Sequence, residues 1–370
     1  MPLIKNPSFD PAKHDPICAF IADVHWTERF PAYRIEQRTD RTFADVLSRK
    51  MERCFDFCID HNNIPLFCCG DLFDRARDFL DYFSLSRFMT DYFMKHPNFY
   101  RTSSESFKFY VIDGQHDMRN HDGSDERTSL RLLSQQVIRS EQHNEYVKVV
   151  YKIGKGEGEI ESPIFQHPCI EPCVYGMGWN SDMPKGFVPE NKKRKPKSDY
   201  VNVLFCHKTL WHTTPPYPGC AEGNVSAWSQ EVAKHNFDFV FSGDNHIAFS
   251  AKCGNIEFHN IGAFSRRSVD LGKQIPRMCV LCWDKEMGGV VVADIALANP
   301  DDEVFEKEIS FVDKKREKDI DSFTESLAGG FDKTLSFREF LDRVIKSGEC
   351  GEMKLNERQK GILNNVVGTM

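Results

Sequence analysis

Five apolar runs along this chain are each followed, within a few residues, by side chains that bind metal ions in proteins. The runs cover residues 17–22, 64–69, 107–112, 201–206 and 237–241. Apolar runs of this length predict buried β-strands. Because the carboxyl ends of parallel strands meet at one edge of a sheet, we expect the polar residues that follow the runs to lie together there. The pattern therefore predicts an α/β fold with a polar site at a sheet edge.

The polar residues at these ends predict a metal centre. In chain order the expected metal ligands are Asp23, His25, Asp71, Gln115, His207, Asp244 and His246. Asp23 and His25 are two residues apart, so an extended backbone points both side chains the same way. Asp244 and His246 repeat that spacing. Carboxylate oxygens combined with imidazole nitrogens suit Mn²⁺, Fe²⁺ or Zn²⁺ better than Mg²⁺ or Ca²⁺, which prefer oxygen alone.

This set of ligands is large enough for two ions that share one carboxylate. Asp71 follows a glycine at the end of a run, where its carboxylate can bridge both ions. Two ions roughly 3.5–4 Å apart polarise a phosphoryl oxygen for in-line displacement. His116 comes directly after Gln115, and we expect it to protonate the leaving oxygen or stabilise the transition state, with Asp117 orienting its ring. For any single motif an ordinary polar loop competes with this interpretation, but the five endings in a fixed order favour the site.

Composition limits the class of protein. The chain has 370 residues, of which 40% are hydrophobic and 28% charged, as in an ordinary soluble globular protein. It contains no apolar run of about 18 residues, and its first residues lack the apolar core of a signal peptide. We therefore expect a cytoplasmic protein that does not contact a membrane. A net charge of −7 argues against a globally basic nucleic-acid-binding protein but allows local basic contacts.

The 13 cysteines do not resemble a disulfide framework. Several lie within the apolar runs, and Cys54 and Cys58 share one face of a helical pattern. We expect reduced thiols packed as small hydrophobic side chains. Cys279 and Cys282 have the spacing of a zinc motif, but a strand would point them to opposite faces, so a shared zinc ion is not expected.

Hydrophobic periodicity outlines the remaining elements. They are helices at residues 42–61 and 79–96, a short helix marked by Leu130, Leu133 and Val137, strands at 147–153 and 173–177, and a hairpin at 277–283 and 289–297. The first helix joins the first two runs in a β–α–β unit, which makes those two strands parallel.

The composition changes after residue 300, where charged residues dominate. We divide the chain into residues 1–300, which carry the candidate site, and residues 301–370. Two amphipathic helices are expected in the second part, the first opening at Ser336 with a capping-box pattern and the second near Asn356. They could pack on the first part or offer an apolar face to a partner. A basic segment at residues 192–197 is either a solvated loop or a contact to a phosphate backbone.

The order of the motifs resembles the calcineurin-like metallophosphoesterase superfamily. The resemblance rests on residues 23–25, 70–74, 114–117, 207 and 243–246 and on a closing segment at 260–266. Within the superfamily, the spacings, the strand at 174–179 and the C-terminal extension look most like the SbcD-type DNA double-strand-break repair nuclease subunit.

The resemblance implies a four-layer α/β/β/α metallophosphoesterase sandwich with a small C-terminal helical appendage. It implies one metal held by Asp23, His25, Asp71 and His246, another held by Asp71, Gln115, His207 and Asp244, and His116 as the catalytic histidine. It also implies two divalent ions, usually manganese, and phosphodiester hydrolysis of DNA. The implied partner is an SbcC-type coiled-coil ATPase bound by the C-terminal region, and a homodimer is a further expectation.

Two positions depart from the family pattern. Gln115 replaces the usual Asn, which lengthens the side chain by one methylene and keeps the amide oxygen. Asp244 replaces the first His of Gly-His-x-His and adds negative charge. That charge should weaken the Lewis acidity of the second ion and favour a harder metal such as Mn²⁺ over Zn²⁺. Both residues can still bind a metal, and together they suggest a divergent branch such as a phage-encoded one.

The leading prediction is a metal-dependent DNA nuclease that works with an ATPase in repair, recombination or replication. Its candidate phosphate contacts are Arg75, Arg77, Arg119, Arg266, Arg267 and residues 192–197. The first alternative is a phosphoesterase acting on a small nucleotide or a phosphoprotein, which a deep and narrow pocket would favour. The second alternative is a non-catalytic scaffold of a repair complex, which the presence of Asp71 and His116 disfavours.

Overall fold

The computed structural model describes residues 2–31, 42–96, 107–118, 128–140, 145–148, 150–153, 170–179, 181, 200–216, 220, 223–267 and 274–298, and a few residues between 346 and 354. Contacts divide the chain into two units, Met1–Val304 and Phe305–Met370. In the second unit, strands β14 (Glu349–Cys350) and β15 (Met353–Lys354) pair antiparallel. The helices predicted after Ser336 and Asn356 lie outside the described residues, as does the basic segment at 192–197.

The first large sheet contains four of the strands expected from the apolar pattern and the predicted hairpin. Its order is β13 (Gly289–Ala296), β12 (Arg277–Asp284), β1 (His14–Ile21), β2 (Leu66–Cys68), β3 (Phe109–Ile112) and β6 (Val150–Ile153). Strands β1, β2, β3 and β6 run parallel to one another, whereas β12 pairs antiparallel with both β1 and β13. The carboxyl ends of β1, β2 and β3 therefore meet at one edge.

The second large sheet brings together strands from the later part of the first unit. Its order is β10 (Phe249–Cys253), β11 (Ile256–Asn260), β9 (Phe239–Gly243), β8 (Tyr200–His207) and β7 (Glu171–Met177). Strands β7, β8, β9 and β11 are parallel, and β10 returns antiparallel beside β11. Strands β8 and β9 thus end side by side.

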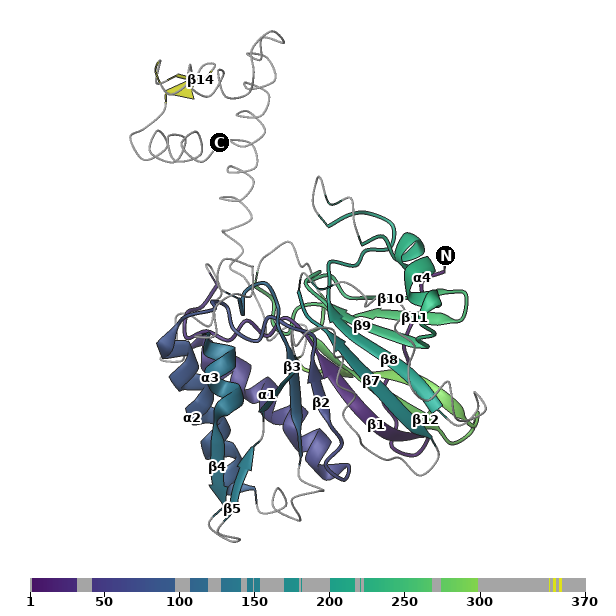
Figure 1. Ribbon diagram of the computed structural model, residues 1–370, viewed down its shortest axis with the longest axis horizontal. Coiled ribbons are helices and arrows are strands. Elements are labelled where there is room, and N and C mark those ends of the chain that lie inside the picture. Colours follow the sequence, from purple (N-terminus) through teal and green to yellow (C-terminus); the bar gives the residue numbers. More distant parts are fainter. Residues whose placement is uncertain are drawn as a thin grey trace. The chain divides into compact units, whose positions relative to one another are not determined.

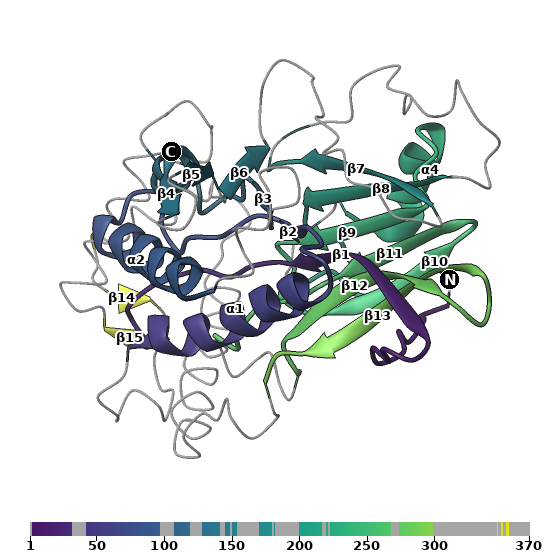
Figure 2. The same cartoon turned by 90° about the horizontal axis from the view of Figure 1, so that it is seen from below.

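The two sheets pack face to face, with helices on both outer faces (Figures 1 and 2). Alternation along single strands shows the layering. In β1, Ala19 and Ile21 join the cluster that contains the buried face of α1 (Phe43–Asp60), whereas Cys18 and Phe20 face the second sheet. In β8, Phe205 faces the first sheet, whereas Leu204 packs in the cluster with α4 (Val225–Lys234). The predicted four-layer α/β/β/α sandwich is confirmed.

The two long helices lie where the periodicity places them. Thr42 caps α1, because its side chain accepts from the Asp45 nitrogen and Asp45 accepts from the Thr42 nitrogen. Helix α2 (Phe79–Lys95) starts at the Asp78 cap, whose carboxylate accepts from the nitrogens of Leu80 and Asp81. Both caps satisfy amides that a helix leaves unpaired at its start, and the cap of α1 is reciprocal.

Three expectations about the elements are corrected. Val137 does not belong to the third helix, α3 (Ser129–Gln135); it is 50% exposed and starts strand β4 (Val137–Ser140). The strand expected at residues 147–153 is two strands, since β5 (Glu145–Lys148) pairs with β4 and only β6 joins the large sheet. The pair β10 and β11 and helix α4 were not expected, although residues 249–253 and 256–259 alternate apolar and polar side chains as strands do.

The described cysteines are free thiols, as predicted. Cys279 packs between the two sheets, whereas Cys282 packs on the helical side of the same strand, so the two side chains point to opposite faces. No helix among the described residues is long and apolar enough to cross a membrane.

Candidate metal centre

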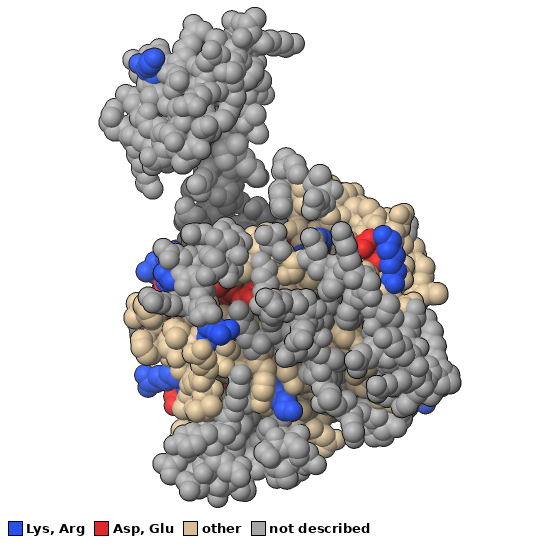
Figure 3. Space-filling view, viewed as in Figure 1, with Lys and Arg blue, Asp and Glu red and all other residues tan. Residues whose placement is uncertain are grey.

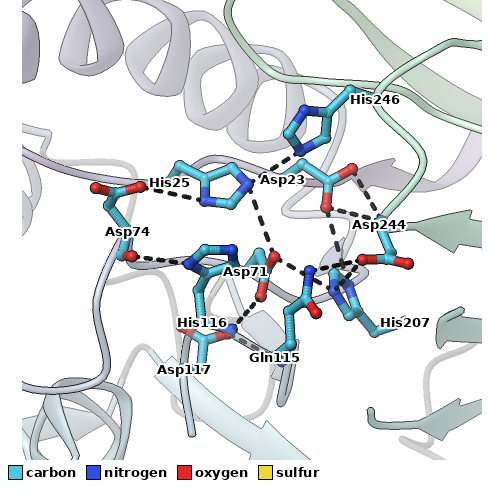
Figure 4. A network of polar contacts seen from close by, with 12 residues as sticks. Asp23, His25, Asp71, Asp74, Gln115, His116, Asp117, His207, Asp244 and His246 are labelled. Carbon is cyan, nitrogen blue, oxygen red and sulfur yellow. Dashed lines mark hydrogen bonds and ion pairs between the residues drawn. The ribbon is translucent and has the colours of Figure 1, made fainter. Parts of the chain in front are cut away.

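The seven predicted ligands gather where strands of both sheets end (Figure 4). Asp23 and His25 follow β1, Asp71 follows β2 and Gln115 follows β3 in the first sheet; His207 ends β8, and Asp244 and His246 follow β9 in the second. Residues more than 200 positions apart in the sequence are in contact, since His25 Nε2 lies 3.2 Å from His246 Nε2. The site therefore sits where strands of both sheets end, whereas the five apolar runs predicted the edge of a single sheet.

The backbone adopts a left-handed conformation at four of these residues. Asp23, His25, Asp71 and Asp244 have φ angles of 50°, 47°, 51° and 77°. The other non-glycine residues with positive φ in the described part of the chain are three asparagines, which tolerate this region. Asp and His also adopt this region more often than most residues, for which it costs about 1–2 kcal/mol each. Such strain is common at functional sites, and here it aims side chains into one centre.

Two glycines allow this close approach. A Cβ on Gly70, whose φ is +91°, would lie 2.4 Å from His207 Nδ1. A Cβ on Gly114 would lie 2.1 Å from both the Asp71 nitrogen and its Oδ1 atom. Any larger residue at either position would displace a candidate ligand.

Asp71 lies between two groups of ligand atoms. Its Oδ2 atom is 3.7 Å from His25 Nε2 and 3.4 Å from His207 Nε2. Asp71 groups with His25 and His116 on one side and with Asp23 and His207 on the other, and the ligand atoms of each group lie within 4.8 Å of one another. A third such group is Asp23, His25 and His246. This position is the one required of a carboxylate that bridges two ions.

Buried polar atoms at the centre fit a metal. Asp71 Oδ2 and His207 Nε2 are buried and have no hydrogen-bond partner. Asp23, Asp71 and His207 are almost completely inaccessible to solvent. Buried groups without partners are costly unless a cation or proton satisfies them. The donor set of carboxylates and imidazoles is therefore suited to divalent cations.

His207 is oriented as a ligand through Nε2. Its Nδ1 atom lies 2.6 Å from the Cys69 carbonyl oxygen, which can only accept, so Nδ1 carries the hydrogen. Burial opposes charge on this ring, but the carboxylates of Asp71, Asp23 and Asp244 outweigh it and raise the pKa of His207 to about 10. In the protein without metal, a proton on Nε2 thus balances the negative charge that a cation would otherwise balance.

The other ligands also have displaced pKa values. Burial raises the pKa of Asp23 well above its usual range, partly opposed by His207. Burial lowers the pKa of His25 well below its usual range, and it lowers the pKa of His246 to about 4 with help from Arg267. Neutral imidazoles are the form that binds metals.

His116 is half-buried beside the ligands. Its backbone nitrogen donates to Asp71 Oδ1 at 2.8 Å, and its ring meets the His25 ring edge-on with centroids 4.8 Å apart. A ring nitrogen of His116 lies within 4.8 Å of ligand atoms of His25 and Asp71. Its Nδ1 atom lies 3.0 Å from the Asp74 carbonyl oxygen, so Nδ1 carries the hydrogen and Nε2 is left for proton transfer.

Asp117 does not orient His116, which corrects the sequence-based role. Its buried carboxylate accepts from the backbone nitrogens of Leu72, Phe73 and Gly114 at 2.9–3.1 Å. Asp117 therefore ties the loop after β2 to the loop after β3, and it positions the loop residues rather than the catalytic ring.

Asp74 and Thr209 contact the site although the sequence analysis assigned them no role. Asp74 holds His116 through its carbonyl, and its Oδ1 atom lies 3.6 Å from His25 Nδ1 and 2.5 Å from Arg267 Nη1. Thr209 donates from its hydroxyl to Asp244 Oδ2. The contacts of Asp74 could have been anticipated, because it closes the segment at residues 70–74 on which the family resemblance rests. No sequence signal marks Thr209.

The candidate phosphate contacts are only partly described. Arg75 and Arg77 are exposed in the segment after Asp74, and Arg266 and Arg267 are half-buried in the segment after β11. Arg119 and residues 192–197 lie outside the described residues. On the face shown in Figure 3, Lys and Arg occupy separate small spots, some beside Asp or Glu, rather than a continuous basic surface, among the residues that are coloured.

The match to a known family agrees with this geometry. The chain belongs to the calcineurin-like phosphoesterase family, whose pattern matches residues 18–248. The protein is thus a member of a hydrolase family that binds divalent metals and acts on phosphoesters. No curated protein matches the chain.

Several solved structures are similar in fold. One is a protein assigned as a 5'-nucleotidase from Staphylococcus aureus in complex with alpha-ketoglutarate, 13% identical with a TM-score of 0.43, covering 81% of this chain and 57% of that chain. The chain thus spans less than two thirds of that protein. Another is an archaeal phosphodiesterase, 11% identical with a TM-score of 0.32, covering 75% of this chain and 99% of that chain. These identities are too low to carry a substrate or partner over to this chain.

Proposed function

We propose that this protein is a metal-dependent DNA nuclease that hydrolyses phosphodiester bonds at a dinuclear site, most favourably with Mn²⁺. The observation that carries the hydrolytic part is the cluster of Asp23, His25, Asp71, His207 and His246, with the half-buried His116 beside them. Asp244 Oδ1 lies 3.8 Å from His207 Nε2 and accepts from Gln115 Nε2. The preference for DNA rests on the SbcD-like order and spacing of the motifs. Repair, recombination or replication in the cytoplasm is the corresponding role.

Asp71 and His116 have different roles in the proposed hydrolysis. Two bound divalent ions would supply the positive charge that polarises the phosphoryl group. Asp71 holds its Oδ2 atom between the two ligand groups, 3.4 Å from His207 Nε2 and 3.7 Å from His25 Nε2. His116 offers Nε2 to the leaving oxygen, because Nδ1 is committed to the Asp74 carbonyl.

Arginines lie close to the site although the net charge of the whole chain is −7. Arg267 lies beside the ligands through its ion pair with Asp74. Arg75 and Arg77 follow Asp74 directly and are exposed. Guanidinium groups at this position can contact phosphates flanking the scissile bond, which supports a polymeric substrate.

The partner proposals concern the rest of the chain. We assign residues 301–370 to binding of an SbcC-type coiled-coil ATPase, on the amphipathic pattern that begins at Ser336. A homodimer is the second proposed assembly. Neither partner takes part in the chemistry assigned to the site.

A cleavage assay tests the proposal. We expect Mn²⁺-dependent hydrolysis of single- or double-stranded DNA, and loss of both hydrolysis and bound metal in Asp71→Ala. Hydrolysis of nucleotides or phosphopeptides with no cleavage of either DNA form would instead support the small-substrate alternative. A wild-type protein that binds Mn²⁺ but hydrolyses neither DNA nor a generic phosphodiester would support the scaffold.

A further inference from the structure

Asp244 is held through its backbone and through both carboxylate oxygens. Its nitrogen donates to Asp23 Oδ1 at 2.9 Å and to Asp23 Oδ2 at 3.1 Å. Its Oδ1 atom accepts from Gln115 Nε2 at 2.9 Å and lies 3.8 Å from His207 Nε2 (Figure 4). Its Oδ2 atom accepts from the Thr209 hydroxyl. A carboxylate held at both oxygens has little freedom to rotate.

The two donors come from different sheets. Gln115 follows β3 in the first sheet, whereas Thr209 lies two residues beyond His207 at the end of β8 in the second. The buried Asn245 donates from Nδ2 to the Leu210 carbonyl oxygen at 2.7 Å, which fixes the segment of Thr209 against the segment of Asp244. Thr209 is therefore set at a defined place relative to Asp244 by the fold.

Both donors are neutral, which preserves the charge of Asp244. Within the described part of the chain, neither Lys nor Arg forms an ion pair with this carboxylate, and its ion-pair distance is to His207 alone. Hydrogen bonds from an amide and a hydroxyl orient the carboxylate and leave its negative charge to interact with a cation. An oxygen ligand with full charge at this place favours hard divalent ions over those that prefer nitrogen.

We propose that Thr209 is a positioning residue for the second metal position, and that Gln115, Asp244 and Thr209 together set the metal preference of that position towards Mn²⁺ over Zn²⁺. The amide of Gln115 orients Asp244 through Nε2, and its oxygen would be the atom available to hold the ion. Gln115 is one methylene longer than the Asn of the family pattern, and Asp244 is shorter than the family's His. The added methylene lets the Gln115 amide reach the Asp244 carboxylate. The proposal rests on the dinuclear metal chemistry of the proposed function and not on DNA as the substrate.

Calorimetric titration of the full-length protein with Mn²⁺ alone tests the positioning role. Removal of the hydroxyl in Thr209→Val should weaken the second Mn²⁺ about 10–100-fold and leave the first unchanged, as expected for a residue that orients a ligand. Thr209→Ser keeps the hydroxyl and should restore two-ion binding. The paramagnetic resonance spectrum should change in parallel, from a coupled pair to a single ion. Two ions bound by folded Thr209→Val with wild-type affinities would overturn the role.

A double variant tests the metal preference. Gln115→Asn combined with Asp244→His should raise the affinity for Zn²⁺ relative to Mn²⁺ at the second position, measured by competition without substrate. An unchanged ratio would overturn the preference. Circular dichroism of each variant identifies any that does not fold, and Thr209→Ser keeps the positioning test valid in that case.

These outcomes are separable from those of the proposed function. If wild-type protein binds two Mn²⁺ ions and the variants behave as expected while DNA is not cleaved, the metal assignment holds and only the DNA substrate is wrong. If wild-type protein binds one ion at most, both the dinuclear chemistry and this inference are wrong.

Discussion

At the scale of single residues, the centre is built from side chains whose local geometry is unfavourable by itself. Asp23, His25, Asp71 and Asp244 adopt a left-handed backbone, and Asp71 keeps a buried oxygen without a hydrogen bond. These costs are tolerable because the surrounding strands fix the geometry and a bound cation compensates the buried charge. Three predictions belong to this scale.

His116→Ala should reduce hydrolysis roughly 10²–10⁴-fold, because it removes the group placed for proton transfer to the leaving oxygen. The metal content, measured by elemental analysis, should stay near that of the wild type. His96→Ala, at the exposed end of α2, serves as the control and should keep full activity. A fully active His116→Ala protein would make this histidine a bystander.

The raised pKa of His207 predicts that metal binding releases a proton. Since that pKa is about 10 in the protein without metal, the ring is charged at neutral pH and must lose its proton to bind through Nε2. Titrations with Mn²⁺ in buffers of different ionisation enthalpy should show this release and an affinity that rises with pH.

The same shift has a defined sign for stability. The folded pKa of His207 exceeds its unfolded value of about 6.5, so its contribution to the metal-free protein is complete below that pH. That contribution is lost as the pH rises towards about 10. Urea titrations between these values should show the loss, and His207→Asn should not.

At the scale of elements, loops are joined to strands by single polar side chains. Asp117 accepts hydrogen bonds from Leu72, Phe73 and Gly114, which connects the loops that carry Asp71 and His116. Thr42 and Asp78 perform a simpler task by capping α1 and α2. The precision of the centre thus depends on buried groups that are not ligands.

Asp117→Asn should lower the free energy of unfolding by about 3 kcal/mol, because the amide replaces an acceptor that serves three buried nitrogens. Asp91→Asn makes the same chemical change in an exposed ion pair on α2 and should cost at most about 1 kcal/mol. Urea unfolding of the metal-free proteins measures both. Equal effects in the two variants would contradict the joining role of Asp117.

At the scale of the whole molecule, the centre exists only because two sheets meet. His25 and Asp71 belong to one sheet, and His207 and His246 to the other. A cation bound between them would hold the strand ends of the two sheets together, so metal should stabilise the folded state.

Removal of metal with a chelator should lower the melting temperature, and added Mn²⁺ should restore it. Binding at a concentration of about 100 times the dissociation constant stabilises a protein by about 2.7 kcal/mol. Scanning calorimetry gives both values. A melting temperature that is independent of metal would show that the ions do not connect the sheets.

Deletion of residues 330–370 should spare Mn²⁺-dependent cleavage and abolish binding of the ATPase. The candidate site lies wholly within the first unit, which ends at Val304. A pull-down with the purified ATPase and a cleavage assay test the two halves of this prediction. An unchanged pull-down would contradict the assignment of the C-terminal region.

Much of the fold was predictable from local patterns. The strands that precede the ligands, helices α1 and α2 and the β12–β13 hairpin follow from runs, periodicity and caps that act over short stretches. The split between β5 and β6 was not predictable, since the apolar pattern continues through both and only the pairing partner separates them. Strands β10 and β11, in contrast, pair with each other as neighbours in the chain and alternate in polarity, so they could have been predicted.

The sequence by itself determined the identity and order of the candidate ligands, because residue type and spacing fix which atoms can bind a cation at the end of a strand. Only the tertiary structure decided what those ligands contact. In the structure Asp117 contacts the backbone of two loops rather than His116, and the Asp74 carbonyl oxygen contacts the His116 ring. The Thr209 hydroxyl contacts Asp244. The physical reason is that hydrogen bonds require distances of about 3 Å between atoms from different strands, and only the packing of the two sheets sets those distances.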